Sequence, residues 1–404
     1  MRRVVVTGMG IWSCIGQDLQ TVTESLRQGR SGIIFDPKRI EYGLRSGLVG
    51  NVPRPDLKPL LPRKFRATMS EDAEYAYMAT RQAFEQAGIS DEYLHQNEVG
   101  IIFGSDYMTN GKIESARIIA KEKNSLMIEP NALFKCETSS VSMNLSSIFH
   151  LRGISFCVGA ACASSLLSTG IGMTLIKEGK QDIIVVGGAN EISPHGAALL
   201  DVIDGLSLNN SDPTAASRPF DIDRDGLVTS GGGATLILEE YEHALKRGCK
   251  PLFEILGYGC CADGHYLAKD YKNYVRAMQR ALDDAGVGVE DVEYINSAAS
   301  GGVWTDVYEA TSLTKLFADR KVWISSTEST TGHEHNMAGV SKTIYTYLMM
   351  QNNFIAQNEN IKVLIPEARS LRIVRSTIHQ SFNIAMINNT GLGGVNCSLI
   401  ISKI

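Results

Sequence analysis

The sequence predicts an α/β protein made of two similar lobes, in which helices and sheets are stacked in layers. Short strand-like runs rich in valine and isoleucine alternate with longer helix-like segments, a pattern typical of buried sheets flanked by helices. The order of these elements in the first 250 residues recurs in the remainder, which indicates an internal duplication. In each half, the third strand leads into a turn of small residues and then a helix.

The strands expected in the first half are 2–8, 99–104, 154–159, 182–188 and 234–240. Those expected in the second half are 252–259, 292–297, 322–327, 383–389 and 397–403. A helix-like segment ending in Arg-Gly separates the two sets near 240–252, so we place the lobes at 1–250 and 251–404. The first lobe carries extra sequence at 105–150, where we expect a binding surface or a subunit contact.

Composition excludes several classes of protein. The chain has 404 residues, of which 44% are hydrophobic and 21% charged, as in globular rather than disordered proteins. A net charge of −5 gives no general attraction to nucleic acid, and no apolar run reaches the roughly 18 residues of a membrane helix. The eight cysteines have neither the CxxC spacing of a zinc site nor that of a disulfide scaffold. We therefore expect reduced thiols and a cytoplasmic protein without nucleic-acid partner or membrane span.

Cys162 is the strongest candidate for a nucleophile. It follows a strand and a Gly-Ala-Ala turn and precedes a helix-like run, where free backbone N–H groups and the helix dipole favour a thiolate. A cysteine among alanines is more often a small buried hydrophobic residue, but the strand–turn–helix context reverses that expectation here. Cys157, Cys260 and Cys261 lack this context and are interpreted as structural.

Four segments give the chain a resemblance to a known family. They are GAACASS around Cys162, AASRPFDIDRDGLVTSGGGATLILEEYEHALKRG at 215–248, SSTESTTGH at 325–333 and GLGGVN at 391–396. Together they resemble the condensing enzymes of fatty acid and polyketide synthesis, and most closely the elongating β-ketoacyl-carrier-protein synthases of type II systems. The resemblance implies a thiolase fold with layers in the order α-β-α-β-α and mixed five-stranded sheets.

The family uses a Cys-His-His triad with a supporting lysine. The resemblance assigns acyl acceptance to Cys162 and makes His333 the second histidine. The first histidine is replaced by Ala298, in INSAAS where the family has a His-Gly-Thr loop, and the lysine is replaced by Glu328. A lost donor to a developing oxyanion typically costs ~10²–10³ in rate, and a carboxylate near the thiol would raise its pKa. Decarboxylative condensation should therefore be impaired. Acyl transfer to Cys162 needs only a thiolate and backbone N–H donors at the turn, so this step should be less affected.

The resemblance assigns further positions outside the triad. Thr390 stands where the family has a gatekeeping phenylalanine, ahead of an oxyanion and tunnel loop formed by Gly391, Leu392, Gly393 and Gly394. A basic stretch with Arg63, Lys64 and Arg66 could meet the acidic face of acyl carrier protein, although a solvated helix start fits it nearly as well. His335 is expected to point away from His333, at the surface or an interface. No cofactor and no metal are expected.

Three functions follow from these residues. The first is a subunit resembling a chain length factor, paired as a heterodimer with an intact ketosynthase in a type II polyketide or aryl-polyene system. The second is a self-sufficient homodimeric β-ketoacyl synthase or acyltransferase that uses Cys162 with a non-standard triad. The third is a purely structural or regulatory carrier-protein binder. Ala298, Glu328 and Thr390 favour the first, while the retained Cys162 favours the second.

Overall fold

The computed structural model describes residues 2–106, 109–266, 270–318 and 320–404. Its main feature is a sheet of eleven strands in the order β12-β10-β9-β14-β15-β8-β1-β7-β6-β4-β5. The strands of the first half are β1 (Val4–Trp12), β4 (Gly100–Gly104), β5 (Ser155–Val158), β6 (Ile183–Asn190) and β7 (Gly232–Glu240). Those of the second half are β8 (Phe253–Ala262), β9 (Tyr294–Asn296), β10 (Trp323–Ser325), β12 (Arg372–Ile373), β14 (Ile384–Gly391) and β15 (Val395–Lys403).

These strands confirm the predicted α/β class and both sets of five sequence runs. The sequence did not reveal how the two sets meet: β1 pairs with β8 in antiparallel register over Val4–Val6 and Phe253–Ile255, so the lobes share one hydrogen-bonded ladder. It also missed β12 at the edge of the large sheet and the short strands β2 (Ile33–Phe35), β3 (Leu48–Gly50), β11 (Phe354–Ile355) and β13 (Ile378–His379). Each of these has two or three residues, too few for a periodic pattern.

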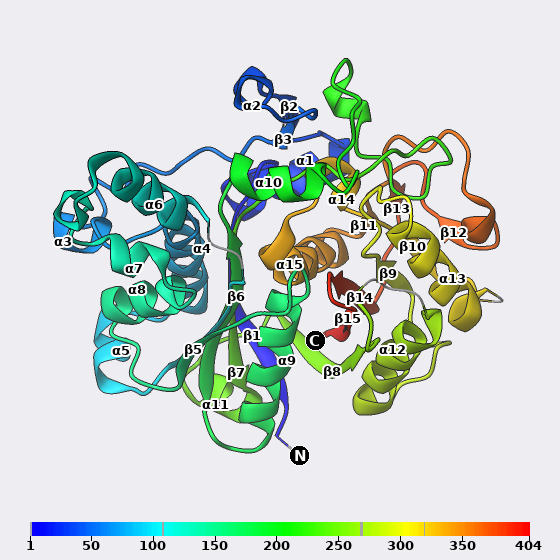
Figure 1. The fold of residues 1–404 in the computed structure, drawn as a ribbon. Helices are drawn as coiled ribbons and strands as arrows, with labels where there is room; N and C mark the ends of the chain where they lie inside the picture. The colour runs from blue at the N-terminus through cyan, green and yellow to red at the C-terminus, as the bar shows by residue number, and fades with distance from the viewer. Residues whose placement is uncertain (1, 107–108, 267–269, 319) are drawn as a thin grey trace.

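Helices cover both faces of the sheet and fill the space between the lobes (Figure 1). The longer helices are α1 (Leu19–Gln28), α4 (Glu71–Ala87), α6 (Asn110–Glu122), α8 (Ser140–Phe149), α9 (Ser164–Lys177), α10 (Pro194–Asp201), α12 (Tyr271–Ala285), α13 (Thr305–Phe317) and α15 (Ala338–Gln351). The shorter ones are α2 (Pro37–Tyr42), α3 (Arg63–Arg66), α5 (Asp91–Gln96), α7 (Ala132–Cys136), α11 (Tyr241–Lys246), α14 (Glu328–Thr331) and the 3₁₀ turns η1 (Ser125–Met127), η2 (Pro213–Ala215), η3 (His335–Met337) and η4 (Pro366–Ala368).

The helices α9 and α15 pack against each other in the centre of the molecule (Figure 1). Each begins shortly after the third predicted strand of its lobe, so they are the equivalent helices of the duplication. Their close approach depends on Gly339, where an added Cβ would lie 2.7 Å from the Leu166 backbone nitrogen. α15 is buried from Ala338 to Met350, which explains why its sequence shows no polar face.

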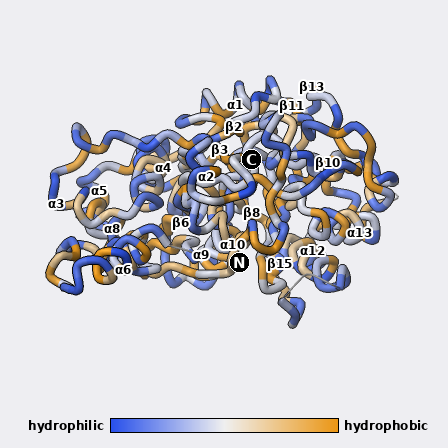
Figure 2. The backbone as a smooth tube through the Cα atoms, turned by 45° about the horizontal axis from the view of Figure 1, so that its top comes forward, coloured by the Kyte–Doolittle hydropathy of each residue, from blue (hydrophilic) through white to orange (hydrophobic). Residues whose placement is uncertain are grey.

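The hydrophobic core is divided among the layers. The largest cluster lies between the lobes around α9 and α15, and two others lie under the helices on the outer faces, beneath α4 and beneath α12 and α13. In Figure 2 hydrophobic stretches run through the interior strands, whereas the outer loop that carries α3 is mainly hydrophilic. None of the helices in the described residues is long and apolar enough to cross a bilayer.

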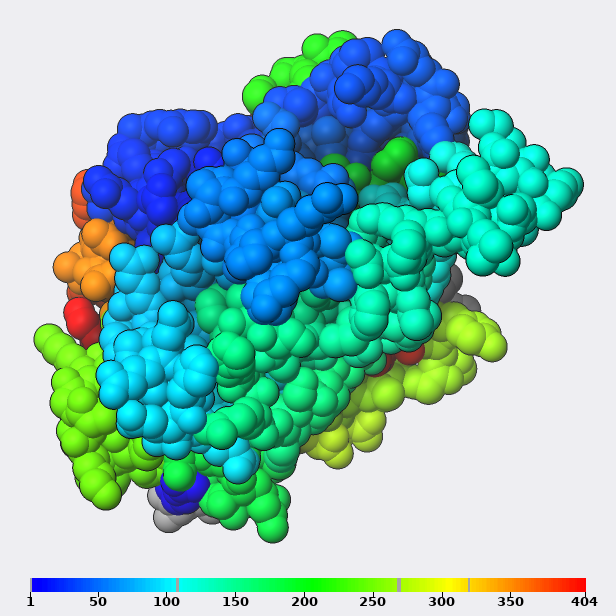
Figure 3. Space-filling view, turned by 90° about the vertical axis from the view of Figure 1, so that its left-hand side faces the viewer, coloured from blue at the N-terminus to red at the C-terminus, as the bar shows by residue number. Residues whose placement is uncertain are grey.

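The predicted insertion at 105–150 forms α6, η1, α7 and α8. Figure 3 shows the part around α6 and η1 projecting from the body of the first lobe. Leu126 is 88% exposed and Leu133 65% exposed, so this segment presents apolar side chains at its surface. That observation agrees with the expected role in binding or subunit contact, which stays a prediction.

Candidate active site

The turn that carries Cys162 lies between β5 and α9, as the sequence predicted. Ala161 adopts φ +47°, an unusual conformation for a residue with a side chain. The turn is held by Asp106 Oδ2, which accepts from the Ala161 N–H at 2.7 Å, and by Ser164 Oγ, which accepts from the Ala160 N–H at 2.8 Å. These contacts leave the thiol of Cys162 half-buried, two residues ahead of the first residue of α9.

His333 is positioned from the second lobe. Its backbone N–H donates to Val228 O at 2.7 Å, and its carbonyl accepts from the Ser230 N–H at 2.8 Å, which fixes the chain on both sides of the imidazole. Nε2 of His333 lies 2.9 Å from Cys162 Sγ. The structure therefore brings together the two residues that the sequence assigned to catalysis.

Glu328 lies on the side of His333 away from Cys162. Its Oε2 is 2.6 Å from His333 Nδ1, and its Oε1 is 3.2 Å from Nζ of Lys342. The sequence argument placed this carboxylate beside the thiol, where it would oppose a thiolate. The observed arrangement differs, because the imidazole stands between the two groups. A carboxylate in this place orients the ring and stabilises its protonated form.

Lys342 connects this cluster to the C-terminal strand pair. Its Nζ donates to Asn388 O at 2.9 Å and to Asn389 Oδ1 at 2.8 Å, and Asn389 Nδ2 donates to Cys162 O at 2.6 Å. The polar contacts thus run in a closed circuit from Cys162 through His333, Glu328, Lys342 and Asn389 back to the Cys162 backbone. Sequence reasoning missed Lys342 and Asn389. A lysine inside the otherwise apolar segment of α15 is the signal that could have revealed the first.

The electrostatics of this circuit favour an ionised Glu328. Burial alone would raise the pKa of Glu328, but His333 and Lys342 outweigh it and hold the pKa below its usual value. Burial likewise opposes protonation of His333, yet the carboxylate of Glu328 and the nearby Cys162 raise its pKa well above the usual range. The pair therefore behaves as a carboxylate bound to a strongly basic imidazole.

Ala298 follows β9 and is buried at 7% exposure. The carbonyl of the preceding Ser297 lies 3.4 Å from Lys342 Nζ, so this loop begins beside the same circuit. Nearby Glu309 is also buried, which raises its pKa to about 7, against the effect of the Ala298 N–H and Lys342. Within the described residues, Oε2 of Glu309 has no hydrogen-bond partner. The side chain of Ala298 is thus a methyl group that can donate no hydrogen bond. Its correspondence to the first histidine of the family stays a prediction.

The glycine loop lies directly against the turn of Cys162. A Cβ on Gly391 would be 2.4 Å from Ala160 O, so only glycine allows this approach. Thr390 is the neighbour of Asn389 on β14 and is half-buried. The Gly393 N–H donates to Tyr266 O and the Gly394 N–H to Gly391 O. These two amides are therefore occupied within the protein, and the role of the loop in binding an oxyanion stays a prediction.

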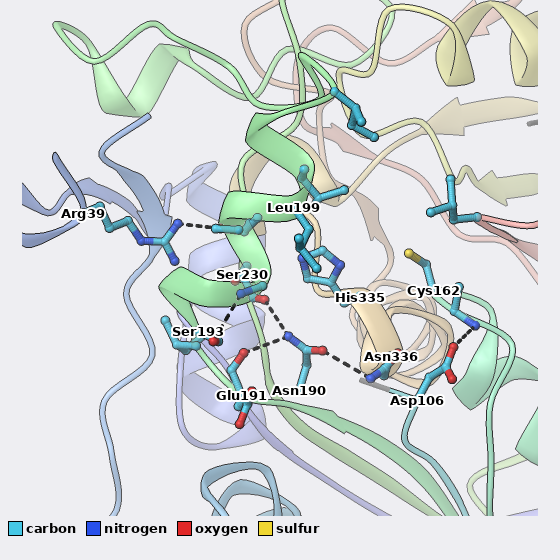
Figure 4. A pocket seen from close by; sticks show the side chains of 18 residues that line it. Arg39, Asp106, Cys162, Asn190, Glu191, Ser193, Leu199, Ser230, His335 and Asn336 are labelled. Carbon is cyan, nitrogen blue, oxygen red and sulfur yellow. Dashed lines mark hydrogen bonds between the residues drawn. The ribbon is translucent and has the colours of Figure 1, made fainter. Parts of the chain in front are cut away.

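A pocket of about 390 Å³ opens at Cys162 and runs along α10 (Figure 4). Aliphatic side chains from α10 and the residues after it form much of its wall, and polar groups surround the end at Arg39. Its lining comprises Arg39, Asp106, Ala161, Cys162, Asn190, Glu191, Ile192, Ser193, Gly196, Ala197, Leu199, Leu200, Ile203, Thr229, Ser230, His335, Asn336 and Leu392. A cavity of this size and character suits an acyl chain attached to Cys162.

His335 lines this pocket, contrary to the expectation that it points away from the site. Its ring centroid is 4.8 Å from that of His333, in an edge-to-face arrangement. The reason is backbone conformation: His335 has φ +47°, which turns the chain at the start of η3 and returns the side chain toward Cys162. Burial, and then the proximity of His333, lower its pKa to about 3, so it is a neutral ring.

The donor atoms of Cys162, His333 and His335 all lie within 4.8 Å of one another. Thiolate and imidazole donors suit Zn²⁺, but both nitrogens of His333 are already engaged with Glu328 and Cys162. We assign no metal to this cluster. The absence of metal and cofactor stays a prediction.

The basic residues proposed for docking lie on α3, at the outer edge of the first lobe (Figure 1). Arg63 and Lys64 are exposed, whereas Nε of Arg66 donates to Leu61 O at 3.0 Å. Two of the three charges are therefore free to meet a partner, and the third caps its own turn. Their role in docking stays a prediction.

Comparison with known proteins agrees with the site. Residues 1–244 match the family model "Beta-ketoacyl synthase, N-terminal domain", and residues 252–362 match "Beta-ketoacyl synthase, C-terminal domain". The division at 250 that we predicted stays an expectation.

Among curated proteins, the chain is 36% identical to 3-oxoacyl-[acyl-carrier-protein] synthase 1 of Escherichia coli (strain K12), over all of both chains. It is 30% identical to 3-oxoacyl-[acyl-carrier-protein] synthase 2 of Vibrio cholerae, over all of this chain and 99% of the relative. Among solved structures, a β-ketoacyl synthase from Burkholderia phymatum STM815 superposes with a TM-score of 0.95 at 31% identity, covering all of both chains. The ishigamide ketosynthase/chain length factor superposes with a TM-score of 0.92 at 26% identity, over all of this chain and 99% of the other. The fold is thus the thiolase fold of ketosynthases, and the chain belongs to the β-ketoacyl synthase family.

Proposed function

We propose that this chain works on acyl chains carried by acyl carrier protein, as the partner subunit of an intact ketosynthase in chain elongation. The observation that carries this proposal is Ala298, which leaves the site without one of the two imidazoles of the family while Cys162 and His333 remain in contact. Loss of such a donor opposes decarboxylation far more than it opposes acyl transfer.

The comparisons support the substrate class. The curated relatives are named as synthases of 3-oxoacyl groups on acyl carrier protein, and they match this chain over its whole length. One structural neighbour is described as a ketosynthase/chain length factor. A chain of this fold with an incomplete triad can keep the dimer interface and shape the acyl pocket while its partner performs condensation.

A second candidate is a self-sufficient homodimeric enzyme. The short contact between Cys162 Sγ and His333 Nε2, at 2.9 Å, favours it, because a subunit with a purely structural role has no need of an aligned nucleophile and base. The two candidates differ in whether the chain extends an acyl group without help.

Intact-protein mass spectrometry separates the two. The purified chain is offered acyl- and malonyl-carrier protein, alone and together with a candidate ketosynthase paralogue that retains both histidines. We expect elongated product only in the mixture, and native mass spectrometry of the mixture should show a heterodimer. Extension by the chain alone would overturn the proposal in favour of the self-sufficient enzyme.

Matched cysteine variants sharpen the result. Cys162→Ala in this chain should leave elongation by the mixture largely intact, whereas alanine at the corresponding cysteine of the partner should abolish it. If Cys162→Ala alone stops elongation, the condensing step belongs to this chain and the proposed division of labour is wrong.

A further inference from the structure

The arrangement around His333 has the parts of a nucleophile, a base and an orienting carboxylate. Nδ1 faces Glu328 Oε2 at 2.6 Å and Nε2 faces Cys162 Sγ at 2.9 Å, so the imidazole is held on both sides. An ionised carboxylate only accepts hydrogen bonds, so Nδ1 must carry the proton. In the neutral ring the Nε2 lone pair then points at the thiol, which is the tautomer of a general base.

We propose that Cys162, His333 and Glu328 form a proton relay with which this chain hydrolyses acyl thioesters, and so releases acyl groups from their carrier without extending them. The proposal rests on the proposed substrate class, acyl thioesters, but it does not depend on the division of labour with a partner. Glu328 and Lys342 are positioning residues in it, whereas Cys162 and His333 meet the reacting atoms.

The buried Lys342 keeps Glu328 ionised, so that its carboxylate can orient His333. Lys342 Nζ contacts Oε1, the oxygen that does not face the imidazole, so Glu328 stays charged without losing its contact with His333. The charged or titratable groups facing His333 are Cys162, Glu328 and the neutral His335, with Lys342 and Glu334 behind them. The lowered pKa of Glu328 and the raised pKa of His333 agree with a carboxylate–imidazolium pair.

The reaction has two balanced halves. In the first, His333 Nε2 takes the proton of the Cys162 thiol, Sγ attacks the thioester carbonyl, the bond from that carbonyl to the carrier sulfur breaks, and the carrier thiol leaves with the proton from Nε2. In the second, His333 takes a proton from water, the hydroxide attacks the acyl carbon, the bond to Sγ breaks, and the proton returns to Cys162. The products are a free carrier thiol and a carboxylic acid.

Two features of the site favour water over a carbon nucleophile as acceptor. Ala298 contributes no donor to an enolate, so the carbon nucleophile that the family generates by decarboxylation lacks that stabilisation. Cys162 is half-buried and neighbouring Leu392 is 61% exposed, so water reaches the acyl carbon from the mouth of the pocket.

The test measures decanoic acid released from decanoyl-pantetheine and from decanoyl-carrier protein by the full chain alone. We expect release by the unaltered chain and none above background from Cys162→Ala. Glu328→Gln should lower the rate by roughly 10²-fold or more, within the range for a general-base system, and Glu328→Asp should restore part of it. The matched control is Glu334→Gln, the same change at a buried glutamate of the same segment that contacts Ser341 and Tyr345 instead.

A second measurement separates positioning from structural damage. The alkylation rate of the Cys162 peptide by iodoacetamide is followed against pH. The carboxylate of Glu328 favours the protonated imidazole that stabilises a thiolate, so alkylation of the unaltered chain should persist to lower pH than alkylation of Glu328→Gln. Should Glu328→Gln fail to fold, the doubly neutral Glu328→Gln/Lys342→Met variant takes its place.

The proposal is overturned if the unaltered chain releases no more acid than Cys162→Ala. It is equally overturned if Glu328→Gln matches Glu334→Gln in both rate and pH profile. Failure of the partner-subunit proposal has a different signature, namely elongation by the chain alone, and leaves the hydrolysis measurement unaffected.

Discussion

Lys342 lies entirely inside the protein with its Nζ 3.2 Å from Oε1 of Glu328, itself only 1% exposed. The two charges sit on different elements, α15 and α14, and both lie behind the imidazole of His333. A buried pair of this kind need not add net stability, but removing one partner leaves the other charged and unpaired at a cost of roughly 3–5 kcal/mol.

Lys342→Met should lower the free energy of unfolding by less than the roughly 3–5 kcal/mol of a fully unpaired buried charge, because Glu328 keeps its contact with His333. The double variant Glu328→Gln/Lys342→Met removes both charges and should lose markedly less than Lys342→Met alone. Chemical denaturation of the single and double variants measures the coupling. Equal losses in Lys342→Met and the double variant would mean that the two charges do not depend on each other.

Exchanging the two charges should keep the pair and place a lysine at position 328, where the resemblance to the family predicts one. We expect Glu328→Lys/Lys342→Glu to be more stable than Glu328→Lys alone, which would bury two lysines together. Adding Ala298→His to the exchange should raise decarboxylation of malonyl-carrier protein by roughly 10²-fold, the worth of one donor to an oxyanion. Carbon dioxide release is the measurement, and an unchanged rate would show that position 298 does not face the substrate.

Stability should vary with pH through Asp72, which is 1% exposed on α4. Burial raises its pKa to about 7. The folded state therefore holds a proton that the unfolded chain has released above about pH 4, so stability should fall as pH rises from about 4 to about 7. One such group contributes a slope of at most about 1.4 kcal/mol per pH unit. Asp72→Asn should make the fall of the denaturation midpoint less steep across this window, while Glu309 and Glu334, whose pKa values burial also raises to about 7, maintain the remainder. An unaltered slope would show that Asp72 makes no contribution.

The pocket beside Cys162 should set which acyl chains the thiol accepts. Ala197 is buried on α10 and lines the pocket, so Ala197→Trp should fill it. We expect acylation of Cys162 by a dodecanoyl thioester to fall at least tenfold while acetyl transfer changes little. The control is Leu245→Trp, at a position on α11 that is 45% exposed. An equal fall for both acyl groups would indicate damage to the turn instead of a loss of space.

Most of the fold could be predicted because its strands are buried and rich in valine and isoleucine, as in 182–188 and 383–389. The pairing of β1 with β8 could not be predicted, because neither sequence run indicates which strand lies beside it in the sheet. The site could be predicted where the neighbouring sequence indicates the role of a residue. Cys162, which follows a strand and a tight turn and precedes a helix, is the example. The partnership of Lys342 with Glu328 was hidden because it depends on two elements meeting in space, 14 residues apart in sequence.

His335 illustrates the same limit at shorter range. Spacing alone placed it away from His333, but a single residue at positive φ reverses the direction of the chain. Glu328 illustrates the same limit for electrostatics. Whether its carboxylate opposes or favours a thiolate at Cys162 depends on which side of the His333 imidazole it occupies, and the sequence does not give that side.

The contact between Cys162 and His333 joins residues 171 positions apart, one from each lobe. Neither lobe can assemble the reactive pair alone, so the site forms only after the chain has closed a loop of 171 residues, and long-range contacts of this kind form slowly in folding. During synthesis Cys162 is made well before His333. Until the second lobe packs against the first, the Cys162 thiol has no imidazole beside it. The chemical reactivity of the Cys162 thiol therefore reports whether folding is complete. It appears when the two lobes come together, and it should be lost as soon as they separate.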